Sequence, residues 1–154
     1  MMSVRQSEER SVRDLLRIGR ELGVSVHVAH LPGDLLGGWY PETARVFVRF
    51  GLTPSEFRSV LAHELGHVYY QHTCDDGPSE AQANLYAARL LIDDEAYVRA
   101  EAVSPHPHDI AEELGVTVEL VQTYRSRCLT SVRGVTYTRP RLGIGQWDLR
   151  RAHA

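Results

Sequence analysis

The sequence has no lysine and only two cysteines, and it contains no long apolar run. Two cysteines are too few for the disulfide framework of a small secreted domain. None of the apolar stretches approaches the roughly 20 residues that a membrane-spanning helix needs. The first residues also lack the apolar segment of a secretory signal. We therefore expect a cytoplasmic protein that does not contact a membrane.

Charge is unevenly distributed along the 154 residues, although the net charge is only -3. Seven arginines and a single acidic residue follow Gln122, so the preceding part of the chain is acidic. A basic tail on an acidic body can bind nucleic acid or an acidic partner, and it can equally be a solvated surface segment. Hydrophobic content of 43% is ordinary for a globular protein of this length.

The first third of the sequence predicts one helix followed by a small sheet. Apolar residues at helical spacing predict an amphipathic helix over residues 7–22. Alternation over residues 24–28 predicts a strand, and residues 37–40 and 45–48 predict a hairpin. We expect these strands to form an antiparallel sheet, whose edge can hold a peptide by strand addition.

The next predicted helix contains a motif of metal-ligating and acidic residues. Thr53, Pro54 and Glu56 give it a capping box with proline at its first position. It continues through His-Glu-Leu-Gly-His at residues 63–67. Histidines four apart lie on one helical face and can bind one zinc ion, while Glu64, about 100° round the helix, can act as general base. We expect a catalytic site that holds one Zn²⁺.

A third metal ligand is needed, because catalytic zinc usually has three protein ligands. A metzincin would have glycine at position 70 and histidine at 73, but the residues are Tyr70 and Thr73. The better candidate is Glu80, at the start of a second predicted helix. Asn84 shares its face and can orient a ligating histidine by a hydrogen bond.

Other polar residues follow the motif closely and have two possible roles. Tyr69 and Tyr70 can stabilise an oxyanion or simply pack. His72 can bind or polarise the substrate, or it can be a surface residue. Cys74 lies near the same face, but a site of two histidines and a glutamate needs no thiolate.

Residues 109–124 have the pattern of a helix-turn-helix, with Ala111 at the crossing, Gly115 in the turn and Thr117 as cap. A helix that reads DNA should present polar and basic residues near its start. This one presents Val118, Glu119 and Leu120, which favours packing on the core or recognition of a protein.

The motifs resemble the ImmA/IrrE family of metallopeptidases. The similarity lies in residues 61–67, in residues 80–91 and in the upstream stretches 31–33 and 37–40, all within residues 12–95. Gln82, Tyr86 and Ile92-Asp93 depart from the usual family pattern, but none is a proposed ligand. The resemblance implies zinc ligands His63, His67 and Glu80 with catalytic Glu64. Members are often encoded by phages or mobile elements, and they cleave, or relieve repression by, helix-turn-helix repressors.

The sequence therefore predicts an α+β fold, in which a small antiparallel sheet packs on a helical zincin-like core with a C-terminal helix-turn-helix-like pair. We expect a metallopeptidase domain over residues 1–103, the helix pair over 104–130 and a basic tail over 131–154. The predicted function is a zinc endopeptidase that cleaves a protein, and the family resemblance implies that this protein is a helix-turn-helix repressor. The alternative is a nucleic-acid-binding regulator that uses the helix pair and the tail, with zinc only structural.

Overall fold

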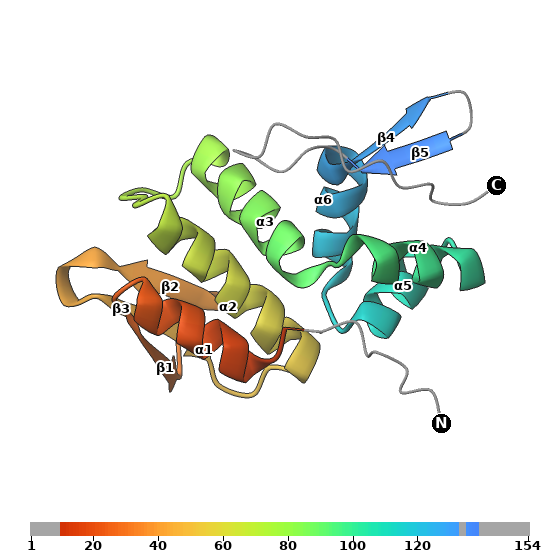
Figure 1. Cartoon of the computed structure of the whole chain (residues 1–154). Coiled ribbons are helices and arrows are strands. Elements are labelled where there is room, and N and C mark those ends of the chain that lie inside the picture. The colour runs from red at the N-terminus through yellow and green to blue at the C-terminus, as the bar shows by residue number, and fades with distance from the viewer. Residues whose placement is uncertain (1–9, 133–134, 139–154) are drawn as a thin grey trace.

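The protein is described by a computed structural model that covers residues 10–132 and 135–138, with the side chains of residues 10–129 (Figure 1). The predicted helix start at Ser7 and residues 139–154 of the predicted tail lie outside the described residues. The elements are α1 (Val12–Glu21), β1 (Ser25–Ala29), β2 (Gly37–Tyr40), a 3-10 turn (Pro41–Thr43), β3 (Arg45–Arg49), α2 (Pro54–Tyr69), α3 (Gly77–Leu91), α4 (Asp94–Val103), α5 (Pro107–Leu114), α6 (Val118–Cys128), β4 (Leu129–Val132) and β5 (Val135–Thr138).

The three-stranded sheet has the order β1-β3-β2. The predicted α+β class is confirmed, but the sheet is mixed rather than antiparallel, because β1 pairs in parallel with β3. The loop between β1 and β2 crosses the end of β3, where the Arg49 guanidinium donates hydrogen bonds to the carbonyls of Leu31 and Leu35 at 3.1 and 2.7 Å. The crossing leaves β2 as an edge strand.

Helices α1 and α2 pack together against this sheet, and α3 lies beside α2 (Figure 1). Helix α2 therefore lies between the sheet and α3. Its fully buried Leu61 and Leu65 share one core with Val46 and Val48 of β3. Among the described residues, no helix is both long and apolar enough to cross a membrane.

The ends of α2 and α3 are set by local sequence. Thr53 and Glu56 form the predicted capping box at the start of α2, with Thr53 Oγ1 accepting from the Glu56 amide at 3.2 Å. Asp76 caps α3 by accepting from the Ser79 amide at 2.8 Å. Such caps satisfy the amides that begin a helix. They fix the residues at which α2 and α3 begin.

Close contact between α2 and α3 depends on small residues. A Cβ added to Gly66 would lie 2.9 Å from the Ala83 Cα atom and 3.0 Å from its carbonyl oxygen. These are backbone atoms, which cannot move aside without shifting a helix. The pair Gly66 and Ala83 therefore holds the two helices at the separation that brings the motif of α2 next to Glu80.

The turn between α5 and α6 is fixed to α2 by buried polar groups. The Arg58 guanidinium donates to the Arg10 carbonyl at 3.0 Å and to the carbonyls of Leu114 and Gly115. The Thr117 amide, at the start of α6, donates to Ser59 Oγ at 3.1 Å. Gly115 takes a left-handed conformation at the end of α5, as the turn requires. The helix pair thus packs on the helices of the motif, while the predicted domain limits stay a prediction.

Candidate metal centre

Three side chains meet where the last turns of α2 face the first turn of α3. His63 and His67 point their Nε2 atoms toward each other at 3.1 Å. The carboxylate of Glu80 lies 3.1 Å from His63 Nε2 through Oε2 and 2.9 Å from His67 Nε2 through Oε1. Within the described residues, these three are the group with metal-ligating atoms close enough to hold one ion. The structure thus brings together His63, His67 and Glu80.

The spacing of these atoms suits a tetrahedral ion. Two ligands at roughly 2.0–2.1 Å from a tetrahedral zinc ion lie about 3.3 Å apart. The three separations of 3.1, 3.1 and 2.9 Å are slightly shorter than this. Two imidazoles and one carboxylate are also the donor set of many catalytic zinc sites. The side chain of Glu80 is 41% exposed, so the centre is open to solvent on that side.

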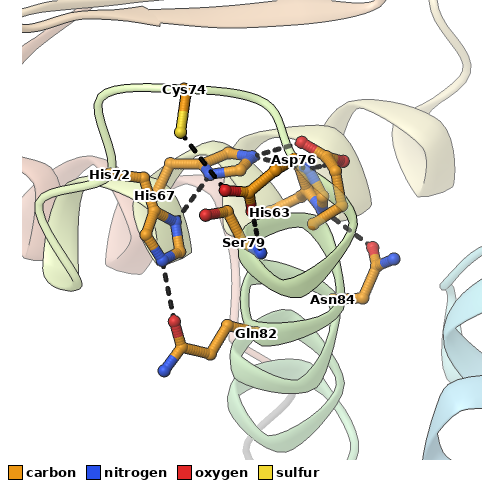
Figure 2. Close-up of polar contacts among 9 residues, drawn as sticks. His63, His67, His72, Cys74, Asp76, Ser79, Gln82 and Asn84 are labelled. Carbon is orange, nitrogen blue, oxygen red and sulfur yellow. Dashed lines mark hydrogen bonds and ion pairs between the residues drawn. The ribbon is translucent and has the colours of Figure 1, made fainter.

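A hydrogen bond sets the tautomer of His63, and burial disfavours the charged form of His67. His63 Nδ1 lies 2.8 Å from the amide oxygen of Asn84 (Figure 2). Because that oxygen only accepts, Nδ1 carries a proton, and the neutral ring then has its lone pair on Nε2, the atom that faces Glu80. Burial, and next the neighbouring His63, lower the pKa of His67. A neutral imidazole is the form that ligates a cation.

Glu64 lies on α2 under the edge strand of the sheet. It is only 7% exposed. Burial, and then the charges of Glu80 and Asp75, raise its pKa to about 8. Its carboxylate packs against the backbone of β2, because a Cβ added to Gly37 would lie 3.1 Å from Glu64 Oε1. A buried carboxyl group with a raised pKa beside a polar cluster is a typical general base or acid.

The residues predicted to contact substrate lie beyond His67. His72 faces His67, with their Nδ1 atoms 2.9 Å apart, and its Nε2 lies 2.8 Å from Gln82 Oε1 (Figure 2). The ring of Tyr70 stacks on His72 with centroids 5.7 Å apart, and Tyr69 meets Tyr70 edge-on. A role of Tyr70 or His72 in binding substrate or stabilising an oxyanion stays a prediction.

Cys74 is exposed and does not belong to the group of ligating atoms. Its thiol donates to the Asp76 carboxylate at 3.3 Å, and this contact raises the pKa of the thiol. A thiol that keeps its proton is a poor ligand and a poor nucleophile. The cysteine is therefore held at the start of α3 rather than in the metal centre.

Two residues of the site carried no clear signal in the sequence. Gly37 touches Glu64 only because β2 crosses α2, a contact between elements distant in the chain. Gln82 is visible in the sequence only as a departure from the family pattern, and its partner His72 lies across the turn between helices. Local spacing does not reveal either contact.

Comparisons with known proteins show similarity over the part of the chain that contains the metal centre. The family model Peptidase_M78, described as IrrE N-terminal-like domain, matches residues 21–124, a range that includes every residue of the centre. A solved structure of a Mycobacterium tuberculosis transcriptional regulator is similar, with a TM-score of 0.58 and 19% sequence identity. That match covers 79% of this chain and 42% of that chain, and it supports the fold alone. None of the curated proteins matches the sequence.

Proposed function

The chain belongs to the Peptidase_M78 family (IrrE N-terminal-like domain), and on that premise we propose that it is a zinc-dependent endopeptidase acting on a protein substrate. The family implies a metallopeptidase-like function and is in general zinc-dependent. One observation carries the proposal beyond the family. The centre of His63, His67 and Glu80 lies beside a buried glutamate, Glu64, that ligates nothing in the group. A purely structural metal site has no need of such a group.

The chain's own residues divide into those that hold the ion and one that moves a proton. His63, His67 and Glu80 would hold one zinc ion, leaving a fourth position open. When bound, zinc polarises a carbonyl, lowers the pKa of water and favours the carboxylate form of a nearby acid. Glu64 then accepts a proton from the attacking water and delivers it to the amine that leaves.

The edge strand β2 is the proposed binding site for an extended substrate segment. It lies at one side of the sheet, paired on its other side with β3. Its first residue, Gly37, contacts the side chain of Glu64. A peptide added to that edge by backbone hydrogen bonds would pass close to the proton-accepting carboxylate.

The proposed substrate is a helix-turn-helix transcriptional repressor, and the proposal draws on the resemblance to the ImmA/IrrE peptidases. The alternative, direct binding of nucleic acid, has less support from the helix pair. Helix α6 buries Leu120, Val121 and Tyr124 in the core. Arg125 donates to the Tyr97 hydroxyl at 2.8 Å and to the Pro105 carbonyl, so its guanidinium is already engaged.

Removal of the metal tests the proposed reaction. We expect zinc-loaded protein to cleave a helix-turn-helix repressor encoded beside it, giving a new N-terminus detectable by mass spectrometry. The chelator 1,10-phenanthroline should stop the cleavage, and added zinc should restore it, because the ion supplies the electrophile. Cleavage that continues in the metal-free protein would exclude the mechanism. An intact repressor together with cleavage of other proteins would exclude only the proposed substrate.

Replacement of Gly37 by alanine tests the contact between β2 and Glu64. The added Cβ would lie 2.8 Å from Val60 Cγ1 and 3.0 Å from Glu64 Cγ, so the carboxylate must move. We expect kcat/KM to fall by about 10-fold or more, as misplacement of a catalytic group usually causes. The zinc content should not change. Gly38→Ala is the matched control, because the atoms nearest to its Cβ belong to the exposed side chain of Tyr40 and not to Glu64. If Gly37→Ala and Gly38→Ala are both as active as the wild type, Gly37 does not position Glu64.

A further inference from the structure

The outer nitrogen of His67 is the start of a chain of hydrogen bonds that the proposed function does not use. His67 Nδ1 lies 2.9 Å from His72 Nδ1, and His72 Nε2 lies 2.8 Å from Gln82 Oε1. Figure 2 shows the three side chains in this order, with His72 between the other two. His67 comes from α2, His72 from the turn after it, and Gln82 from α3. The chain therefore connects both helices of the metal centre on one side.

The backbone at the end of α2 explains why His72 returns to His67. Gln71 takes a left-handed conformation with φ 54°. Its amide donates to the Val68 carbonyl at 3.0 Å, and the His72 amide donates to the His67 carbonyl at 3.0 Å. This pair of bonds is the Schellman motif, which folds the residue after the cap back over the last turn of the helix. The His67 carbonyl thus accepts a hydrogen bond from the His72 amide, and the imidazole rings of the two residues also lie in contact.

The direction of each hydrogen bond in this chain follows from the amide oxygen of Gln82, at which the chain ends. A side-chain amide oxygen only accepts, so His72 Nε2 carries the proton that is shared with Gln82. A neutral His72 then has a lone pair on Nδ1, which accepts from His67 Nδ1. His67 is left with its own lone pair on Nε2, the atom that lies 2.9 Å from Glu80 Oε1. One acceptor at the surface therefore sets the tautomers of two histidines.

We propose that His72 and Gln82 are positioning residues, which hold His67 in the tautomer and orientation that present Nε2 to the metal. The inference rests on the proposed function, because it takes the centre to bind zinc. It gives His72 a role different from contact with substrate. Helix α3 then orients both imidazoles, since Asn84 accepts from His63 Nδ1 in the same way at 2.8 Å. Metal-ligating histidines commonly donate their second N–H to such an acceptor.

Nitrogen NMR of the zinc-loaded wild-type protein determines the tautomers of His67 and His72 directly. Long-range ¹H–¹⁵N spectra distinguish the two tautomers of each histidine ring. We expect His67 with its proton on Nδ1 and His72 with its proton on Nε2. A His72 ring that is protonated on Nδ1 would be unable to accept from His67 and would overturn the proposal. This readout does not depend on catalytic activity.

Zinc affinity, measured by competition with a chelator, tests the consequence. We expect His72→Ala and Gln82→Met to weaken zinc binding by about 10–100-fold, the usual effect of removing an outer partner of a ligand. Methionine matches glutamine in size but does not accept the bond. Gln82→Glu keeps an acceptor at that site and should bind zinc at least as tightly as the wild type. The control is Thr73→Ala, an exposed neighbour of His72, which should leave the affinity unchanged.

The outcomes separate this inference from the proposed function. If the wild type binds zinc and cleaves its substrate while Gln82→Met and His72→Ala bind zinc normally, only the positioning role is wrong. If the wild type binds no zinc, both proposals fail. Circular dichroism of each variant verifies that a weaker affinity does not arise from loss of the fold.

Discussion

Glu64→Gln is expected to lower kcat/KM for peptide hydrolysis by about 10²–10⁴-fold, the usual contribution of a general base. Glutamine has nearly the same shape as glutamate, but its amide does not take a proton from water. The substitution is well suited to this site, because Glu64 is buried under Gly37 and a smaller residue would leave a cavity. Initial rates on a cleaved peptide, with wild type and variant each loaded with zinc, measure the effect.

The zinc content of Glu64→Gln should remain one ion per chain, because Glu64 is not among the three ligating side chains. The fold should also be retained or slightly stabilised. The wild-type carboxyl group is desolvated, and burial raises its pKa to about 8. A variant that loses zinc together with activity would instead indicate that Glu64 is itself a ligand. Activity close to that of the wild type would exclude Glu64 as the base.

His63→Ala and Glu80→Ala are expected to weaken zinc binding by more than about 100-fold, because loss of a ligand should exceed the 10–100-fold effect of losing its outer partner. The ligating atoms of His63, His67 and Glu80 form a triangle with separations of 3.1, 3.1 and 2.9 Å. Each variant removes one of these three ligands. Isothermal titration calorimetry of metal-free protein measures the affinity. The added zinc should also raise the thermal midpoint of the wild type more than that of either variant, since a ligand that binds only the folded state stabilises it.

His30→Ala provides the control for the metal-binding variants, because His30 is exposed and lies outside the triangle. Its zinc affinity should equal that of the wild type. If either His63→Ala or Glu80→Ala binds zinc like His30→Ala, the assigned ligand set is wrong.

Features that depend on local sequence were predictable. The capping box of Thr53 and Glu56 is visible as residue types at fixed spacing, and it forms as predicted. The motif on α2 also specifies its own geometry, because residues four apart share a helical face. The hairpin of β2 and β3 formed as predicted for the same reason, since a short connection joins neighbouring strands.

Other contacts between elements that are distant in the chain were not predictable, although Glu80 and Asn84 were correctly expected beside the histidines of α2. The sequence does not encode locally that β1 pairs with β3, and the predicted antiparallel sheet was wrong on that point. The contact of Gly37 with Glu64 depends on the same arrangement of strands. His72 reaches His67 because Gln71 adopts the left-handed conformation. Glycine or asparagine at this position would have indicated that conformation in the sequence, whereas glutamine does not.

We propose that Glu64 and the group of His63, His67 and Glu80 hydrolyse a peptide bond with one zinc ion. The most direct measurement incubates zinc-loaded wild type and zinc-loaded Glu64→Gln with a mixed peptide library in H₂¹⁸O. Mass spectrometry then records ¹⁸O in newly formed carboxyl groups. We expect new ¹⁸O-labelled C-termini from the wild type and almost none from Glu64→Gln. Equal labelling by the two proteins, or none from the zinc-loaded wild type, would contradict the proposal.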